Sequence, residues 1–339
     1  MRFKELDALR GIAAMLVVLF HFTMNTEKQN LGFNLGVTGV DLFFMISGFV
    51  ILLSLNHVKY SYQFVINRVS RLYPTYWACV TFTFLLINFT SIFRLTMTEF
   101  VHYLANMSMF QFYFRVDDLD GPYWTMIIEM IFYIVMLFLF HFKYLKYLNL
   151  IGMLSMSACV LMNVFYSDNV WVVIIMKGVP FFQFIPLFFA GTIFYTIYTT
   201  NKNHFKNYIM LACCLLSQIS LFEYGGRSNG FVNQEEYAIM VLLYFIIFTL
   251  FVHGKLGFLV NRVTLFLGEI SFALYLVHQM ISVNYIIPYL TETTHLNFWL
   301  IRFIALVVVL ILGTLITNYI GAPYSKKLKE KLNLMVHKK

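Results

Sequence analysis

Residues 6–22 read LDALRGIAAMLVVLFHF, a stretch that is almost entirely apolar but carries Arg10 near one end and His21 near the other. A run of this length can cross the hydrocarbon core of a bilayer, about 30 Å thick, as a helix. An ionisable group inside such a segment is costly, and it indicates a functional role. The stretch therefore predicts a membrane-spanning helix that carries part of a functional site.

The composition of the whole chain is that of a membrane protein. Of the 339 residues, 60% are hydrophobic and 12% are charged, whereas soluble domains are about 45–50% apolar and about 25% charged. Long apolar runs recur along the chain, and no alternating pattern typical of a β-barrel competes with them. We expect an all-α polytopic membrane protein with about ten transmembrane helices. The expected spans are 8–24, 36–55, 72–93, 123–142, 145–166, 181–199, 208–222, 237–252, 264–287 and 298–320.

The distribution of basic residues predicts the orientation in the membrane. With ten spans, both termini lie on one side together with every second loop, and this side holds 18 of the 24 lysines and arginines. Basic loops stay in the cytoplasm, so both termini are predicted to be cytoplasmic. The net charge of +8 reflects this topology and not nucleic-acid binding. We expect one transmembrane domain at residues 1–323 and a basic cytoplasmic tail at 324–339.

Cysteine and histidine spacing gives no sign of a metal site. The four cysteines fall inside predicted spans without CxxC spacing, and the nine histidines show neither HxxxH nor HExxH spacing. Because structural and catalytic zinc sites use such spacings, we expect no metal cofactor.

Arg10 and His21 lie near opposite ends of the first predicted span. Arg10 and His21 are eleven residues apart, which is about 16 Å along a helix and close to three full turns. Both side chains therefore project from the same face. Arg68 and Arg71 lie at the cytoplasmic end of the third span. The sequence thus places basic groups at one membrane face and an imidazole well inside the bilayer.

Three other spans carry ionisable groups in the central to outer part of the membrane. These groups are Asp41, Glu129 and His278. Two of the spans also show a polar stripe with helical spacing, which is typical of a face turned toward a cavity or another helix. The stripes are Thr125, Glu129 and Tyr133, and Gly268, Ser271, Tyr275, His278 and Ser282.

Each of these residues also has a simpler structural interpretation. An intramembrane histidine often only forms a hydrogen bond between helices. Asp41 lies near the outer interface, where an acid favours a helix N-terminus, and Arg68 and Arg71 suit positive-inside anchors. Glu129 is harder to explain in this way, because a buried carboxylate needs a partner.

Six blocks of the chain resemble, in order, the signature blocks of the acyltransferase-3 family of membrane proteins. The blocks are LDALRGIAAMLVVLFHF, GVTGVDLFFMISGFVILL, INRVSRLYPTYW, GPYWTMIIEMIFY, FIPLFFAGTIFY and LGEISFALYLVH, between residues 6 and 278. Members are bacterial inner-membrane enzymes that move an acyl group, commonly acetyl from acetyl-CoA, onto extracytoplasmic or lipid-linked sugars. The resemblance implies an O-acetyltransferase in the inner (plasma) membrane that acts on an exopolysaccharide, capsule or O-antigen.

The resemblance also implies roles for individual residues. The family's arginine and catalytic histidine on the first helix fall on Arg10 and His21. Its RxxR pair, which is associated with acyl-CoA, falls on Arg68 and Arg71, and its acid after PYW falls on Glu129. Three positions depart from the family's usual residues without removing an ionisable group. They are Ala8, Thr125 and Val277.

The residues and the resemblance together suggest a mechanism. Arginines at the cytoplasmic mouth suit the phosphates of acetyl-CoA. We expect His21, oriented or made more basic by Glu129, to take the proton of a sugar hydroxyl as it attacks the thioester. An acyl-histidine intermediate is the alternative. The residues expected to position the glycan acceptor are Asp41, Trp124, Tyr133, Tyr275 and His278.

Two other classes of function fit parts of the pattern. A glycan flippase or proton-coupled transporter also uses intramembrane acids and histidines. The chain lacks the internal repeat and the paired broken helices that many transporters show. A structural partner of a polysaccharide-export machine would not need arginines and histidines at opposite ends of one cavity. The sequence specifies neither the glycan, nor the acyl group, nor the oligomeric state.

Overall fold

The computed structural model describes residues 3–90, 96–200, 204–224 and 228–337. Within these ranges every regular element is helical, and nine helices are long and apolar enough to cross a membrane. The prediction of an all-α polytopic membrane protein is confirmed. Nine of the ten predicted spans fall on these nine helices.

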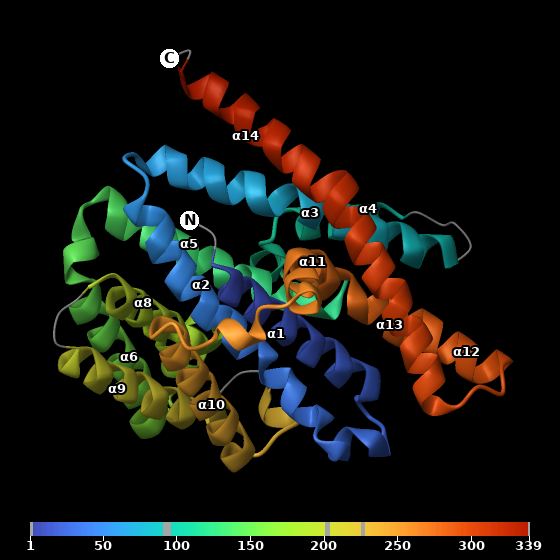
Figure 1. Cartoon of the computed structure of the whole chain (residues 1–339), viewed down its shortest axis with the longest axis horizontal. Helices are drawn as coiled ribbons and strands as arrows, with labels where there is room; N and C mark the ends of the chain where they lie inside the picture. The colour runs from blue at the N-terminus through green and yellow to red at the C-terminus, as the bar shows by residue number, and fades with distance from the viewer. Residues whose placement is uncertain (1–2, 91–95, 201–203, 225–227, 338–339) are drawn as a thin grey trace.

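Fourteen α-helices make up most of the described chain (Figure 1). Two π-helical segments join α11 to α12 and α13 to α14, and such segments often occur at functional sites. The bounds are α1 Lys4–Thr23, α2 Gly39–Asn56, α3 Ser61–Thr90, α4 Met97–Met107, α5 Trp124–His141, α6 Leu148–Tyr166, α7 Val170–Gly178, α8 Ile185–Thr199, α9 Phe205–Leu221, α10 Gln234–Val252, α11 Arg262–Gln279, a π-helix Met280–Ile286, α12 Ile287–Thr293, α13 Phe298–Leu315, a π-helix Ile316–Gly321 and α14 Ala322–His337.

The remaining predicted span, 72–93, falls on α3, and its residues 91–93 lie outside the described ranges. This helix begins at Ser61 and continues for 30 residues. Its first half contains Arg68 and Arg71, so α3 is less apolar than the nine other long helices. The arginine pair is thereby held on a rigid helical turn and not on a loop.

Helix α1 occupies the middle of the bundle, where it packs against α2 and α11 (Figure 1). The contact with α11 is close because both helices present glycine at the crossing. A Cβ atom on Gly268 would lie 2.1 Å from the carbonyl oxygen of Asp7, and one on Gly11 would lie 2.7 Å from the Gly268 nitrogen. Small residues allow such close packing of membrane helices. The crossing sets how near the side chains of α1 and α11 come to each other.

The last three helical segments form one continuous run from Phe298 to His337, and α14 projects from one side of the molecule (Figure 1). We call this side, on which α1 also begins, the terminal side. The predicted basic tail 324–339 is therefore helical through His337, and residues 338–339 lie outside the described ranges. The assignment of the terminal side to the cytoplasm stays a prediction.

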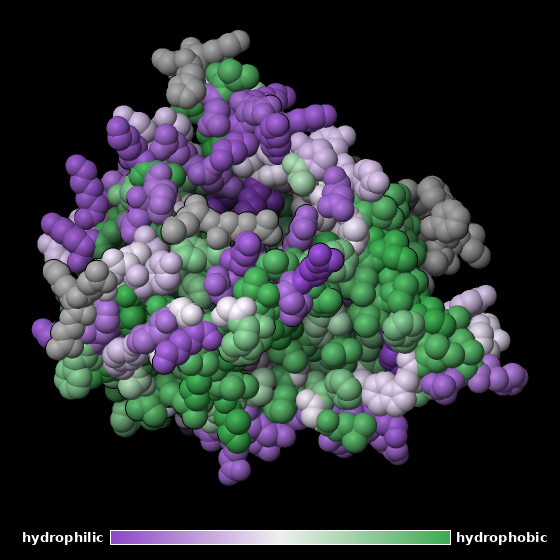
Figure 2. Space-filling view, in the orientation of Figure 1, coloured by the Kyte–Doolittle hydropathy of each residue, from purple (hydrophilic) through white to green (hydrophobic). Residues whose placement is uncertain are grey.

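The surface agrees with a protein that sits in a bilayer. In Figure 2, hydrophobic side chains cover a broad belt, and hydrophilic side chains gather above it on the terminal side. On the same side the view shows a hollow with a strongly hydrophilic floor. Large apolar side chains are exposed on several of the long helices; examples are Phe138, Leu154, Leu216, Ile246 and Phe303.

Candidate active site

Two neighbouring cavities lie beside α1. The larger has a volume of about 280 Å³ and is lined by three arginines, so we call it the arginine cavity. The smaller, of about 150 Å³, is lined by His21, and we call it the histidine cavity. Val40 and Tyr275 line both. The two cavities are thus separated by a single layer of side chains.

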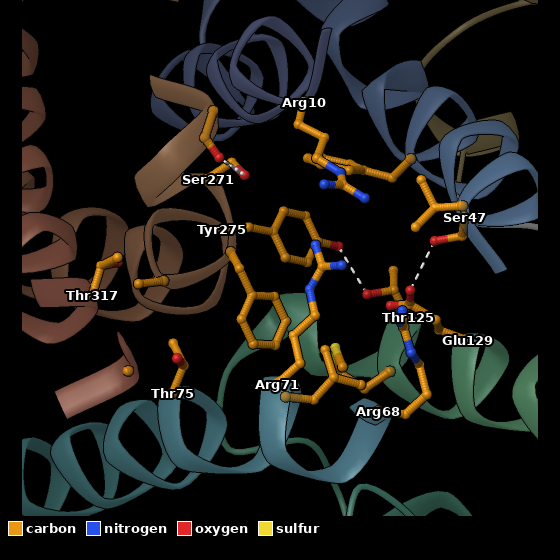
Figure 3. Close-up of a pocket in the computed structure, with 18 of the residues that line it drawn as sticks. Arg10, Ser47, Arg68, Arg71, Thr75, Thr125, Glu129, Ser271, Tyr275 and Thr317 are labelled. Carbon is orange, nitrogen blue, oxygen red and sulfur yellow. Dashed lines mark hydrogen bonds between the residues drawn. The ribbon is translucent and has the colours of Figure 1, made fainter. Parts of the chain in front are cut away.

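Helices α1 and α3 supply the arginines of the arginine cavity. Arg10 comes from α1, and Arg68 and Arg71 are three residues apart on α3. Figure 3 shows the three side chains extending into the same space. Arg10 also forms an ion pair with Asp7 at 3.6 Å and still lines the cavity.

The guanidinium of Arg68 is only partly satisfied by the protein. Its Nη2 donates to the hydroxyl of Ser54 at 3.3 Å, and its planar face lies near the rings of Phe64 and Tyr133, at 5.7 and 5.9 Å. Its Nε is buried and has no hydrogen-bond partner among the described residues. Buried donors normally have partners, so this unpaired Nε is an exception within the protein.

Glu129 lies among the arginines and not beside His21. Its carboxylate accepts hydrogen bonds from the hydroxyl of Ser47, at 2.8 Å, and from the hydroxyl of Tyr133 (Figure 3). Glu129 and Glu269 are the acids among the residues that line this cavity, against three arginines. Three arginines and two acids thus line the cavity, and Arg10 is also paired with Asp7. Arginine side chains that extend into a cavity favour an anionic ligand.

His21 pairs with His278 across the crossing of α1 and α11. Nε2 of His278 lies 3.1 Å from Nδ1 of His21, and the His278 side chain is completely buried. Each ring also contacts a carbonyl on its own helix: Nδ1 of His21 lies 2.9 Å from the oxygen of Val17, and Nδ1 of His278 lies 2.8 Å from the oxygen of Tyr275. The pair is therefore held in one orientation by its own helices.

These contacts determine which ring nitrogens carry protons. A carbonyl oxygen can only accept, so Nδ1 of His278 must donate, which leaves Nε2 of the neutral ring as an acceptor. Nδ1 of His21 then donates to the Val17 carbonyl and to His278. The consequence is that Nε2 of His21 is unprotonated and has no hydrogen-bond partner among the described residues. It is the nitrogen that a general base needs.

We expected Glu129 to orient His21, and the hydrogen bonds point to a different residue. In the described part of the chain the side chain that contacts the His21 ring nitrogen is His278. Glu129 lines the arginine cavity, whereas His21 lines the histidine cavity. The two residues predicted to be catalytic thus belong to neighbouring compartments, and His278 has the orienting position.

The histidine cavity offers groups suited to a polar organic ligand. Trp124 and Tyr275, both predicted from the sequence, line it together with Gln279. The Gln279 amide has no hydrogen-bond partner among the described residues. The amide packs against Gly121, because a Cβ atom added to this glycine would lie only 2.2 Å from the amide oxygen of Gln279. An aromatic ring and a free amide next to an imidazole are typical of a site that orients a small polar substrate.

Asp120 fixes the end of α11 just beyond the histidine. The backbone N–H of Met280 donates to both carboxylate oxygens of this buried residue, at 3.1 and 3.3 Å, where the helix changes to π geometry. Burial raises the pKa of Asp120 well above its usual value, and hydrogen bonds from the backbone of Met280 and Gly121 oppose that shift. The anchor holds His278 and Gln279 in place.

Tyr275 and its neighbours form the wall between the cavities. The hydroxyl of Tyr275 donates to Thr125 Oγ1 at 3.2 Å (Figure 3). Thr125 in turn donates to the Pro122 carbonyl at 3.0 Å. The first of these bonds joins α11 to α5. A long, thin ligand that entered the arginine cavity would have to pass this wall to reach His21.

Asp41 is not part of either cavity. Its carboxylate accepts from the hydroxyl of Tyr237 at 3.0 Å, and Tyr237 in turn accepts from Gln218 at 2.9 Å. Val40, the preceding residue, faces the cavities, whereas Asp41 faces α10. The structure therefore does not bring Asp41 to the other predicted acceptor-binding residues.

Several residues that line the cavities or contact their arginines were missed by the sequence reasoning. Gln279 could have been found, because it directly follows His278 of the polar stripe. Ser47, which lines the arginine cavity, and Ser54, which contacts Arg68, carry no distinctive spacing in the sequence. Their roles depend on the arrangement of α2 against α3 and α5, which the sequence pattern does not encode.

Comparison with known proteins identifies the family of the chain. Residues 3–318 match the acyltransferase domain of the acyltransferase-3 family. The chain is also 24% identical, over 283 residues, to a protein of Acidianus two-tailed virus provisionally named acetyltransferase ORF330, with 81% of this chain and 82% of that protein covered. No solved structure matches the chain significantly. Because the family match covers nearly the whole chain, the protein belongs to the acyltransferase-3 family and is a multi-pass membrane acyltransferase.

Proposed function

We propose that the protein transfers an acetyl group from acetyl-CoA to a hydroxyl of an extracytoplasmic or lipid-linked glycan. The observation that carries the proposal is the pair of cavities, one with three arginines and one with an oriented histidine, which share Val40 and Tyr275. Such an arrangement suits two substrates that arrive from opposite sides and react at a common wall. The viral relative's name also points to acetyl transfer.

The donor would occupy the arginine cavity. Acetyl-CoA carries several phosphate charges on its nucleotide end, while the pantetheine arm that bears the thioester is thin and uncharged. Arginine binds phosphate through paired, charge-assisted hydrogen bonds, and Arg10, Arg68 and Arg71 all line this cavity. Apolar residues such as Phe44 and Met126 line the same cavity and suit the arm.

The acceptor would occupy the histidine cavity. A volume of about 150 Å³ is below the usual range for a whole drug-sized ligand, so the cavity admits the end of a glycan and not a long chain. The ring of Trp124 and the amide of Gln279 would hold the sugar with one hydroxyl toward His21.

Nε2 of His21 would act as the general base. It takes the proton from the acceptor hydroxyl while the oxygen attacks the thioester carbonyl carbon, and a tetrahedral intermediate forms. The carbon–sulfur bond then breaks, and the CoA thiolate takes the proton back from His21. The products are an acetyl ester and free CoA. In the alternative, Nε2 itself attacks the thioester and the acetyl group passes through His21.

The location of the donor fixes the proposed orientation. Acetyl-CoA is made in the cytoplasm and cannot cross lipid, so the arginine cavity and the terminal side would face the cytoplasm. This orientation agrees with the distribution of basic residues. For a bacterial protein, the membrane would be the inner (plasma) membrane.

The test is release of CoA by purified protein in nanodiscs supplied with acetyl-CoA and a preparation of cell-surface glycan. We expect His21→Ala to lower the rate about 100- to 10,000-fold, which is the usual contribution of general acid–base catalysis. His57→Ala is the matched control. His57 also contacts the carbonyl four residues earlier, at 2.8 Å, but it is exposed and outside both cavities.

Two outcomes would count against the proposal. A His21→Ala protein that transfers acetyl at the wild-type rate removes the assigned base. The other is a folded wild-type protein that releases no CoA in nanodiscs but moves a glycan across the membrane of sealed vesicles. Because vesicles, unlike nanodiscs, enclose a second compartment, this result would support a transporter.

A further inference from the structure

The arginine cavity is too small to hold a whole CoA molecule. Its volume is about 280 Å³, whereas pockets for drug-sized ligands range from about 300 to 1,000 Å³, and CoA is larger than most drugs. The pantetheine arm and the diphosphate next to it would occupy this space, but the adenosine 3′-phosphate end of CoA must lie outside it. The surface next to the mouth of the cavity therefore becomes part of the donor site.

Helix α14 forms one wall of that mouth. Ala322 and Ser325 on α14 line the arginine cavity, as do Thr317 and Gly321 on the π-helix before it. The helix is fixed there because it packs against α3, the element that carries Arg68 and Arg71. Ala322 and Ser325 lie beyond residue 318, where the match to the family domain ends. This wall is therefore not assigned by the family resemblance.

The lysines of α14 differ in the direction that they face. Lys329 is four residues after Ser325, so it lies on the same helix face about 6 Å farther from the cavity. Lys327 lies on the opposite face, where its Nζ is 5.4 Å from the centre of the Tyr324 ring. Both lysines are exposed. One lysine thus lies at the mouth of the cavity and the other faces away from it.

We propose that α14 is the nucleotide-binding wall of the donor site and that Lys329 contacts the 3′-phosphate of CoA, which remains outside the arginine cavity. The proposal rests on the proposed function, since it assumes that the cavity takes the pantetheine arm. It changes the role of the basic tail. The tail would bind the donor through one face, in addition to any attraction of its other lysines to lipid headgroups.

The experiment measures binding of CoA to purified wild-type, Lys329→Ala and Lys327→Ala proteins in an uncharged detergent by isothermal titration calorimetry. We expect Lys329→Ala to weaken CoA binding about fivefold, as for one exposed ionic contact. Lys327→Ala should stay within about twofold of wild type. 4′-Phosphopantetheine, which lacks the nucleotide, should bind all three proteins equally.

The possible results separate the inference from the proposed function. The role of α14 alone would be overturned if the two lysine variants weakened CoA binding equally. It would also be overturned if Lys329→Ala weakened the binding of 4′-phosphopantetheine as much as the binding of CoA. The role of α14 would be overturned as well if Lys329→Ala weakened CoA binding only in nanodiscs that contain anionic lipid and not in uncharged detergent. The lysine would then act through the lipid headgroups. A folded wild-type protein that binds no CoA would overturn the proposed function together with the inference.

Discussion

His278 contacts Nδ1 of His21, the same ring nitrogen that donates to the Val17 carbonyl. With its own Nδ1 bonded to the Tyr275 carbonyl, His278 presents Nε2 as an acceptor to Nδ1 of His21. An orienting partner of this kind fixes the tautomer of a catalytic imidazole and raises its basicity. It does not touch the donor, because it does not line the arginine cavity.

We predict that His278→Leu lowers kcat for acetyl transfer about 10- to 100-fold, the usual effect of losing such a partner. KM for acetyl-CoA should stay the same. His278→Gln should recover part of kcat, since its amide oxygen can accept from Nδ1 of His21. Steady-state kinetics of the three proteins are the measurement. An equal loss in both variants, or a raised KM for acetyl-CoA, would mean that His278 has only a structural or donor-binding role.

At the same scale, the sequence predicted which residues share a helix face better than which residues meet the cavities. Helical spacing placed Tyr275 and His278 on one stripe of α11, because both belong to a single helix. It did not show that Asp41 faces away from the cavities. Neighbouring residues point about 100° apart on a helix, so Val40 reaches the cavities and Asp41 does not. The rotation of α2 depends on packing with other helices, which spacing within α2 cannot reveal.

At the scale of elements, the crossing of α1 and α11 holds the histidine pair together. It depends on Gly268, which lies against the backbone of Asp7. Backbone atoms cannot move aside as a flexible side chain can. Any side chain at this position must therefore push the two helices apart.

We predict that Gly268→Val destabilises the protein by about 1–3 kcal/mol, the usual cost of overpacking, and lowers its thermal midpoint. Differential scanning fluorimetry of the purified protein in detergent is the measurement. Gly257→Val is the control, because a Cβ atom at that exposed glycine would meet nothing within 4 Å. Equal midpoints for the two variants would show that the helices can separate at little cost.

Element boundaries were predictable where hydropathy changes sharply and less so elsewhere. Nine spans agree with the prediction because their apolar runs have clear ends. Helices α3 and α14 extend beyond the predicted spans because arginines and lysines are good helix formers. Hydropathy marks where a segment is apolar and does not mark where a helix ends. For this reason the walls of the arginine cavity at α3 and α14 were harder to predict than its apolar interior.

At the scale of the whole molecule, the proposed function requires a defined orientation. The donor site can be filled only if the terminal side faces the cytoplasm. The excess of lysine and arginine on the predicted cytoplasmic loops favours this arrangement. The orientation is therefore a condition for the reaction and is testable without knowledge of the acceptor.

We predict that a green fluorescent protein fused after Lys339 is fluorescent in cells, and that alkaline phosphatase fused at the same position is inactive. Each reporter works on one side of a bacterial inner membrane only. Reporter activity normalised to the amount of fusion protein is the measurement. An active phosphatase fusion would place the arginine cavity outside the cell, away from acetyl-CoA.

The proposed function makes His21 the base for acetyl transfer to a surface glycan. Mass spectrometry of the glycans from a strain that lacks the protein, complemented with wild type, His21→Ala or His57→Ala, is the measurement that tests it. We predict acetyl esters on one glycan with the wild type and with His57→Ala, and their absence with His21→Ala at equal protein levels. Acetylation that persists at the wild-type level with His21→Ala, or that is unchanged when the protein is missing, would contradict the claim.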